Sequence, residues 1–431
     1  MGVPGMKHWG RRFVIGSVGT LLTLSTISPV MASGRPVAAK RTAAPVHLTV
    51  WVPTAGNQNQ PWINIVNIFN RKYKSQNISA SIQFFSWSDY ATKLQVAMTA
   101  GVGPDVLFNG AAATAGLVTS KTVLPLNRFL TKDSPVKNVL PAYEKQTVFK
   151  GHSWFVPVEA SVLLLEYRKD LFKAAHLSPP ATWPELLHDA VRLTVPGKRL
   201  GLDLPSSGIP LEQAFSEFLY SNGGNFVDPT GRHAIVDSAQ AVQSMHWYKL
   251  FFSRGAANIK FVAPSGADPI GTGQAAMELA QGNMANIKSL YPAIYNEIGF
   301  DPFPRAPRGK ENVSFAAANG FYISAQTKYP RDAWLFLETA LKDSGSLAES
   351  QGFSPVLKQD QHAAWIERDP ELKAMYQDIA KSHLQGNPNI PQWINIRNTF
   401  ATDAQAALYG QSSSSVMAKT NADLQQILNQ Q

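Results

Sequence analysis

Cysteine is absent from all 431 positions of the chain. Its absence excludes disulfide bonds, thiolate zinc sites, iron–sulfur clusters, cysteine nucleophiles and lipid attachment to an N-terminal cysteine. Charged residues are also sparse, at 16% of the chain, whereas apolar residues make up 44%. Because a disordered chain shows the opposite balance, we expect a folded protein, and its length predicts at least two domains.

Long runs of like charge are missing as well. The formal net charge is +9, from 39 Lys and Arg against 30 Asp and Glu. No more than two basic residues are adjacent, as at Arg11-Arg12 and Lys40-Arg41, and acidic residues lie between them. A nucleic-acid surface needs clustered positive charge, so we expect no nucleic-acid partner.

The motifs of common catalytic and cofactor sites are also missing. Gly197-Lys198 and Gly309-Lys310 are not followed by Ser or Thr, so neither forms a P-loop, and no Gly-x-Ser-x-Gly elbow occurs. Gly101-Val102-Gly103 and Gly271-Thr272-Gly273 lack the third glycine of a dinucleotide fingerprint, and no two histidines stand four residues apart. These absences favour binding over catalysis and predict neither cofactor nor metal.

The N-terminus has the pattern of a secretory signal peptide. Lys7, Arg11 and Arg12 precede the apolar stretch Phe13–Ala32, which ends in residues that a signal peptidase accepts. We expect residues 1–32 to be cleaved after export by the general route, because the usual Ser or Thr before a twin-arginine pair is Gly10. The alternative is an uncleaved anchor helix, since this stretch is long enough to cross a bilayer.

Residues 33–45 are rich in Ala, Pro, Lys and Arg and are expected to form a linker. Apolar periodicity then predicts a β-α-β-α-β segment, which is typical of a parallel sheet covered by helices. In chain order, its parts are a strand at Val46–Val52, a helix at Gln60–Lys74, a strand at Ile78–Phe84, a helix from Ser86 or Ser88 to Gly101, and a strand at Asp105–Phe108.

Further elements follow from the same patterns. The predicted strands are Trp154–Pro157 and Val162–Tyr167, joined by Val158–Ser161, and later Phe300–Pro304 and Gly320–Ser324. Predicted helices lie at Leu211–Ser221, Ser238–Phe252 and Tyr329–Leu341, and Ser412–Ser415 caps one near the C-terminus. Thr182, with Pro184 and Glu185 after it, predicts a capped helix start.

Four stretches contain motifs that occur together, and in this order, in one protein family. Phe84–Gly110 has Trp-x-Asp-Tyr and Gly-x-x-Pro-Asp-Val, and Trp154–Leu186 has a Tyr-Arg-Lys-Asp run and Pro-x-Thr-Trp-x-Glu. Gly271–Met284 has Gly-x-x-Ala-Met, and Asn319–Leu341 is a strand followed by a helix. From about residue 46 to 431, the chain resembles the extracellular solute-binding proteins of ABC importers, the family that includes maltose-binding protein.

The resemblance implies an α/β fold of the two-lobed periplasmic-binding-protein type (type II). Each lobe would be a mostly parallel sheet flanked by helices, with a hinge between the lobes. The first lobe would comprise residues 46–158 and 303–342, and the second residues 159–302 and 343–431. The chain would cross between lobes near Val158–Ala160, near Pro302–Ala306 and between residues 342 and 355.

A sugar site needs aromatic faces for stacking and amide or carboxylate groups for the hydroxyls. In such sheets the ligand lies beyond the carboxyl ends of the strands. The expected stacking residues are Trp51, Trp87, Tyr220, Phe321 and Trp393, although each aromatic ring could instead pack in the core. The expected hydrogen-bonding residues are Asn57, Gln58, Asn109, Glu159, Asn222, Asn283 and Asn319.

Two of the site positions depend on the resemblance alone. Glu159 matches the glutamate at the crossover of maltose-binding protein that contacts sugar. Met284 lies where the family often has an aromatic residue, which is a departure from the family pattern at that subsite.

The sequence thus predicts a secreted, monomeric binding protein that is not an enzyme. It would deliver a carbohydrate, an oligosaccharide by our expectation, to ABC permease subunits served by a separate ATPase chain. We expect it in the periplasm or outside the cell, associated with the envelope without a cysteine-linked lipid.

Two alternatives stay open. The same fold could bind glycerol-3-phosphate or another polar solute, which would place Arg or Lys in the cleft. A glycan hydrolase would need two carboxylates about 5–10 Å apart. Glu159 and Glu166 are the obvious pair, but their odd separation points them to opposite faces of a regular strand.

Overall fold

The computed structural model describes residues 44–54, 59–261, 267–280, 284–309, 311–378, 383–384 and 390–430. The predicted signal peptide lies outside the described residues, as do Asn57, Gln58 and Asn283. Within the described stretches, no helix is both long and apolar enough to cross a membrane.

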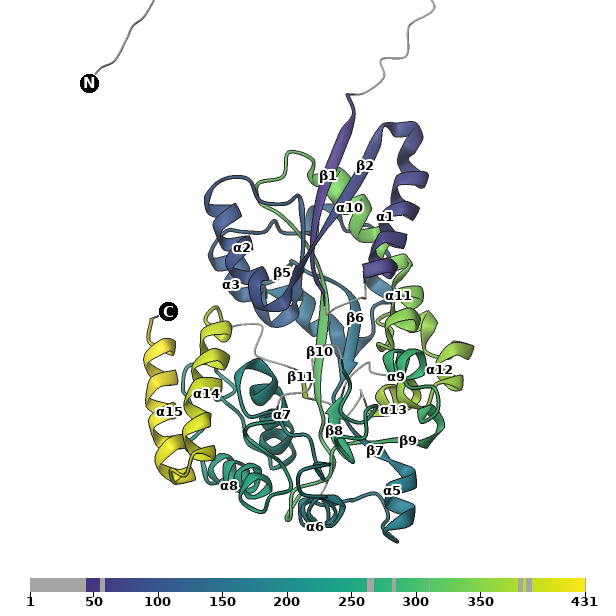
Figure 1. Ribbon diagram of the computed structural model, residues 1–431. Helices are drawn as coiled ribbons and strands as arrows, with labels where there is room; N and C mark the ends of the chain where they lie inside the picture. Colours follow the sequence, from purple (N-terminus) through teal and green to yellow (C-terminus); the bar gives the residue numbers. More distant parts are fainter. Residues whose placement is uncertain are drawn as a thin grey trace, which may run out of the picture. The chain divides into compact units, whose positions relative to one another are not determined.

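The chain begins with the predicted β-α-β-α-β segment (Figure 1). Its elements are β1 (Val46–Thr54), α1 (Asn59–Tyr73), β2 (Ile78–Ser86), α2 (Trp87–Thr99) and β3 (Val106–Gly110). β1 pairs in parallel with both β2 and β3, which confirms the predicted parallel sheet. The alternation that predicted β1 is real, since Leu48, Val50 and Val52 are fully buried. Ser86 caps α2, because its hydroxyl accepts the N–H of Asp89 at 3.3 Å.

Two later strands complete this sheet. β10 (Phe315–Ile323) runs antiparallel to β3 on one side and to β6 (Val156–Val162) on the other, and β11 (His383–Leu384) also pairs with β10. The prediction of a connection at Val158–Ser161 is wrong, because these residues lie inside β6. All seven residues of β6 are buried. A strand covered on both faces shows no simple alternation, so its central residues do not carry the pattern that identifies a strand.

A smaller sheet has the order β8-β7-β9 and consists of β7 (Leu164–Arg168), β8 (Met277–Ala280) and β9 (Ile298–Asp301). Its strand pairs are antiparallel, unlike the mostly parallel sheet expected for the second lobe. Single parallel bridges extend it, from Leu200 to Ala275 and from Asp203 to Glu278. β9 also begins and ends earlier than the predicted strand Phe300–Pro304.

The remaining α-helices and two short strands, together with the short helix η2, are joined by turns and loops. They are η2 (Ala111–Ala113), α3 (Thr114–Thr119), α4 (Pro141–Glu144), β4 (Val148–Phe149), β5 (His152–Ser153), α5 (Lys169–Ala174), α6 (Trp183–Leu193), α7 (Gly208–Ser221), α8 (Ala239–Ser253), α9 (Met284–Leu290), α10 (Pro330–Lys342), α11 (Ser344–Gln351), α12 (Ala364–Arg368), α13 (Pro370–Asp378), α14 (Trp393–Leu408) and α15 (Ser413–Leu428).

The predicted helix starts are confirmed at two caps. Thr182 and Glu185 form a full capping box at the start of α6, in which the Glu185 carboxylate accepts the Thr182 N–H at 3.1 Å. Ser412 caps α15, where its hydroxyl accepts the N–H of Ser415 at 3.1 Å. Each cap satisfies backbone donors that the helix itself cannot pair.

Buried apolar side chains form two large clusters, here called the first core and the second core. The first core lies around β1, β2, β3 and β6 with helices α1 and α10, and the second lies among helices α6, α7, α8, α14 and α15. Some residues pack in a different core from the one that the expected lobe boundaries would give. Leu347 and Val356 pack in the first core, whereas Phe303 and Ala306 pack in the second. One reason is that α11, which contains Leu347, contacts β6.

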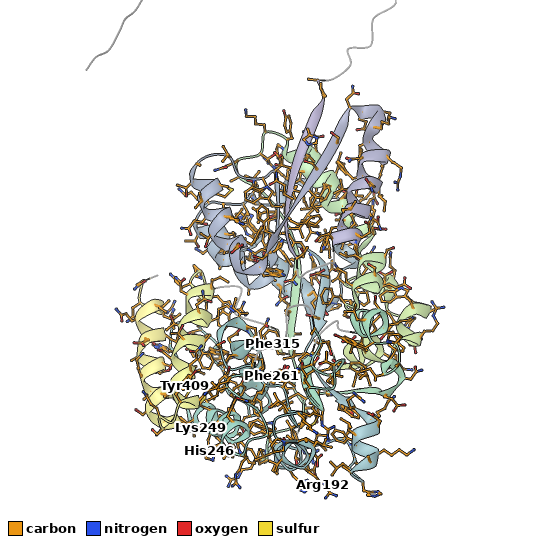
Figure 2. All side chains as sticks on the ribbon, viewed as in Figure 1. Arg192, His246, Lys249, Phe261, Phe315 and Tyr409 are labelled. Carbon is orange, nitrogen blue, oxygen red and sulfur yellow. The ribbon has the colours of Figure 1, made fainter. Side chains whose placement is uncertain are left out.

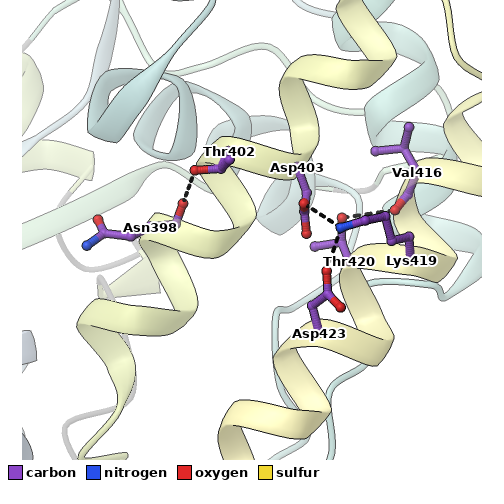
Figure 3. A network of polar contacts seen from close by, with 7 residues as sticks. All are labelled: Asn398, Thr402, Asp403, Val416, Lys419, Thr420 and Asp423. Atoms are coloured by element: carbon purple, nitrogen blue, oxygen red, sulfur yellow. Dashed lines mark hydrogen bonds and ion pairs between the residues drawn. The ribbon is translucent and has the colours of Figure 1, made fainter.

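Helices α14 and α15 pack side by side and are joined by polar contacts at their surface (Figure 3). The ammonium group of Lys419 donates to Asp403 at 2.7 Å and to Asp423 at 2.6 Å. Lys419 is mostly exposed, so these ion pairs contribute little to stability. The apolar residues Phe400 and Leu424, both buried in the second core, hold this pair of helices in place.

Candidate functional site

The carboxyl ends of β1, β2 and β3 meet at one edge of the sheet because the three strands are parallel. Thr54 lies opposite Ser86, and Trp51 lies opposite Leu107. Asn109 comes two residues after Leu107, and Trp87 comes directly after β2. This edge therefore gathers two of the predicted site residues in the place where ligands bind in open α/β sheets.

A pair of polar residues lies on the neighbouring strands. Asn319 in β10 is directly opposite Gly110 of β3 on one side and Glu159 of β6 on the other. The Asn319 amide donates to Oε1 of Glu159 at 3.1 Å. Glu159 is only 4% exposed, so its carboxyl group is held almost entirely within the protein. The structure thus joins two of the predicted hydrogen-bonding residues, which are 160 positions apart in the chain.

This polar pair lies where the two cores meet. Along β10, Phe315 and Ala317 belong to the second core and Phe321 belongs to the first. Alternation along the strand places these residues on the same face as Asn319, which stands between them. Figure 2 labels Phe315 at the second-core end of this row. This face of β10 therefore has one polar position between two apolar clusters.

Burial changes the acid–base behaviour of Glu159. Loss of hydration raises its pKa from the ordinary 4.5 to about 7, and the hydrogen bond from Asn319 partly opposes this rise. The carboxyl group is therefore near half protonation at neutral pH. A carboxylate only accepts hydrogen bonds, whereas the protonated acid also donates one, so this group can match a hydroxyl in either direction.

Two glycines make room for these contacts. A Cβ atom on Gly320 would lie 2.0 Å from the carbonyl oxygen of Val156, where β6 carries a bulge. A Cβ on Gly110 would lie 3.2 Å from Oδ1 of Asn319. We did not single out these glycines from the sequence. The signal was present, because Asn109-Gly110 and Asn319-Gly320 are matching dipeptides, and the antiparallel register places each Asn opposite the other Gly.

Trp87 is the predicted aromatic residue with the most open surface. It is the first residue of α2, is 44% exposed, and its ring centroid lies 6.3 Å from that of Phe108. Trp51 is half-buried, with its ring centroid 4.6 Å from that of Phe85. Trp87 can therefore offer a ring face to a ligand, while much of Trp51 is used in packing.

Three predicted stacking residues lie in the interior of the protein. Phe321 is fully buried against Trp62 and Phe108, and the Trp393 ring packs against Phe226 in the second core. Tyr220 is also buried, and loss of hydration raises the pKa of its phenol. The rings of these three residues are covered by protein in this structure, so they offer no face for stacking.

The remaining predictions fall elsewhere. Asn222 ends α7, and its amide donates to the carbonyl of Gln240 at 2.9 Å and to the side chain of Gln243 at 3.0 Å, which ties α7 to α8. Met284 begins α9, and its side chain is outside the described part of the structure. Nothing in the contacts of Asn222 points to a ligand.

A groove on the surface of the second core does not coincide with the predicted site. It is lined by one face of α8, including His246 and Lys249 (Figure 2), and by Ser412–Ser414. None of the predicted site residues lines it. Lys249 donates to the carbonyl of Gln411 at 2.8 Å, so its charge is already used in joining α8 to the loop before α15.

Among the described residues, the two carboxylates weighed for a hydrolase do not lie together. Glu166 lies in β7 opposite Glu278 and Phe300, whereas Glu159 lies in the other sheet and contacts Asn319. Among the described residues, no group of three His, Cys, Asp or Glu side chains is arranged to hold a metal ion. The arrangement at the edge can bind hydroxyl groups and an apolar ring face.

Comparison with known proteins identifies the family. Residues 56–346 match the family described as bacterial extracellular solute-binding protein, and this match covers more than half of the chain. The chain belongs to this family. Putative binding proteins of Brucella abortus are 21% identical over 362 residues, which span 82% of this chain and 86% of theirs. The maltotriose-binding protein of Pyrococcus abyssi is 24% identical over 330 residues, with 73% of this chain and 68% of that protein covered.

Solved structures of solute-binding proteins share the fold. A protein of Thermotoga lettingae with bound α-D-tagatose superposes with a TM-score of 0.80 at 21% identity, covering 89% of this chain and 100% of that one. The GacH receptor of Streptomyces glaucescens, studied with acarbose, also gives 0.80, at 18% identity and with 90% and 99% covered. These similarities confirm the predicted two-lobed, type II binding-protein fold.

Proposed function

We propose that this solute-binding protein captures a neutral carbohydrate and delivers it to the permease of an ABC importer. The observation that carries the proposal is the buried Glu159–Asn319 pair between the two cores, close to a sheet edge where Trp87 is exposed. Family membership and relatives that bind sugars support it, among them the maltotriose-binding protein and the tagatose-bound neighbour.

The proposed site has the two kinds of group that a sugar requires. An exposed indole such as that of Trp87 covers the apolar C–H face of a pyranose ring. Glu159 and Asn319 pair with hydroxyl groups, and Asn109 at the same edge adds an amide. Buried polar groups that lose water must be paired by the ligand, which favours a polyhydroxylated solute over an apolar one.

The proposed mechanism is binding between the lobes followed by hinge closure. No bond in the solute changes, so the protein acts as a receptor and not as an enzyme. The closed form would dock on the permease as a monomer, and transport energy would come from an ATPase on a separate chain. We place the protein in the periplasm or outside the cell, as the family description indicates.

A phosphorylated solute is the second candidate. The sn-glycerol-3-phosphate-binding protein of Salmonella typhimurium is 26% identical over 289 residues, covering 63% of this chain and 62% of that protein. A phosphate site needs Arg or Lys donors. The proposed contacts Trp87, Asn109, Glu159 and Asn319 include no cation, and the charge of Glu159 would repel phosphate. We therefore favour a neutral sugar.

A panel of solutes tests this proposal through thermal stability. We expect a mono-, di- or oligosaccharide to raise the melting temperature, because a ligand at 100 times its Kd adds about 2.7 kcal/mol. Because 1 kcal/mol shifts the melting temperature of a domain of 150–250 residues by about 2–4 °C, this corresponds to a shift of roughly 5–10 °C. Glycerol-3-phosphate and amino acids are the controls. A response to glycerol-3-phosphate alone would contradict the proposal of a neutral sugar as the solute. Recovery of cleaved sugar would contradict the receptor function and indicate a hydrolase.

Removal of the exposed indole should weaken sugar binding. For Trp87→Ala we expect a loss of about tenfold in affinity, since an aromatic contact contributes roughly 0.5–1.5 kcal/mol beyond the area that it buries. Titration calorimetry with the sugar selected by the panel measures the change. Val96→Ala is the matched control, because Val96 is also exposed on α2. If the two variants bind the sugar with equal affinity, Trp87 does not contact it.

A further inference from the structure

The segment after β3 passes between the two cores. Adjacent residues of η2 belong to different clusters, since Ala111 packs in the first core and Ala112 in the second. Hydrogen bonds fix this turn against the sheet. The Thr114 hydroxyl donates to the carbonyl of Ala111 at 2.7 Å, and its oxygen lies 2.8 Å from the hydroxyl of Tyr322. Tyr322 donates in turn to the carbonyl of Gly110 at 3.2 Å.

The helix that follows, α3, touches the start of α14. A Cβ atom placed on Gly116 would lie 2.9 Å from the carbonyl oxygen of Pro391, and real Cβ atoms do not approach backbone this closely. Ile390 and Trp393, on either side of Pro391 and Gln392, are buried in the second core. α14 also contacts η2. The contact between Gly116 and Pro391 therefore joins the segment after β3 to the segment that leads into α14.

Position 116 requires glycine because a Cβ atom would clash there, and not because of its backbone dihedral angles. Gly116 is inside a helix, a conformation that alanine favours over glycine by about 1 kcal/mol. The φ angle of Gly116 is not positive, so an L residue could adopt the same backbone conformation. The position of the Pro391 carbonyl is the feature of this site that excludes a side chain. Because that obstacle is backbone, a larger residue could be accommodated only if α3 and the segment before α14 moved apart.

We propose that Gly116 is a positioning residue for closure, which sets how closely the two lobes approach at this contact. The proposal rests on the hinge closure of the proposed function. A side chain at position 116 would act as a wedge and favour a more open arrangement. Figure 1 shows α2, α3 and α14 on the same side of β10, so a wedge between α3 and α14 should increase the separation of α2 from α14.

The absence of cysteine makes a direct test simple. Val96→Cys on α2 and Tyr409→Cys directly after α14 place spin labels at exposed positions, and pulsed electron paramagnetic resonance measures the distance between them without any ligand. In this background, we expect Gly116→Ala to shift the distance distribution to larger values and Gly116→Leu to shift it further. The graded increase is expected because leucine is the bulkier wedge.

Gly345→Ala is the matched control. Gly345 is also helical, in α11, but the atoms nearest to its Cβ would be those of the Asp360 carboxylate, the closest at 3.1 Å, and this side chain can move. We expect this variant to keep the parent distribution, and all variants to melt cooperatively. Distributions of both Gly116 variants that superimpose on the parent would overturn the proposal, as would a shift to shorter distances. Because the measurement uses no sugar, a negative solute panel would not affect its outcome.

Discussion

Replacing Arg397 with methionine is expected to destabilise the protein by about 3–5 kcal/mol. Arg397 in α14 donates through Nη2 at 2.6 Å and Nε at 3.2 Å to one oxygen of Glu212 in α7. Glu212 is fully buried and Arg397 nearly so. The variant would leave the Glu212 carboxylate in the second core without its cation, and the cost of burying that charge would no longer be compensated.

Denaturant unfolding of matched variants would separate this effect from a loss of packing. Arg397→Met with Glu212→Leu should recover most of the stability, because removing both charges leaves no uncompensated ion. Lys419→Met breaks an exposed ion pair and should cost less than about 1 kcal/mol. A loss of that small size in Arg397→Met would show that water or other groups already solvate Glu212.

Local patterns predicted the elements whose surroundings are simple. β1 alternates because the face with Leu48, Val50 and Val52 is fully buried, whereas His47, Thr49 and Trp51 on the other face are only partly covered or exposed. Thr182 with Glu185 specifies the start of α6 through contacts within four residues. The motifs that resemble the binding-protein family predicted the order of these elements. In each of these cases, the determining interactions lie close together in the sequence.

Local patterns did not predict which aromatic side chains are exposed at the candidate site. Phe321 and Trp393 are aromatic residues near strand or helix ends, but the neighbours that bury them come from distant elements, such as Trp62 for Phe321 and Phe226 for Trp393. The centre of β6 carries no alternation because both of its faces are covered. Burial on a given face depends on long-range packing, which composition and spacing do not encode.

Pairing across long distances explains the other gaps. The Glu212–Arg397 ion pair joins residues 185 positions apart, and neither residue carries a local signal of its partner. Glu159 and Asn319 were each predicted to bind ligand, but their hydrogen bond to one another was not. The glycines opposite the two asparagines became meaningful only through the register of β3 and β10.

Replacing Glu159 with glutamine is expected to change how stability depends on pH. Burial raises the pKa of Glu159 from 4.5 to about 7, so between these values the folded state holds a proton that the unfolded state has released. Stability from this group is therefore fully present below about pH 4.5 and is lost as the pH rises to 7 and beyond. A shift of this size corresponds to roughly 3 kcal/mol.

Glutamine has nearly the same shape and stays neutral, so Glu159→Gln should remove this part of the pH dependence. The difference in unfolding free energy between parent and variant, measured from pH 4.5 to 8.5, isolates Glu159. Burial also raises the pKa of Asp203, to about 6, but that contribution is present in both proteins and cancels. If the two curves run parallel across this range, burial does not raise the pKa of Glu159 as we infer.

The same variant tests the role of the carboxyl group in binding. At pH 8.5 the parent carboxylate only accepts hydrogen bonds, and at pH 5.5 the protonated acid can also donate one. Parent affinity for the sugar found by the panel should therefore change across pH 7, while Glu159→Gln affinity should stay level. Charge-assisted hydrogen bonds contribute about 1.5–3 kcal/mol, so the parent should change by at least about tenfold. Equal pH profiles would mean that the solute does not contact Glu159.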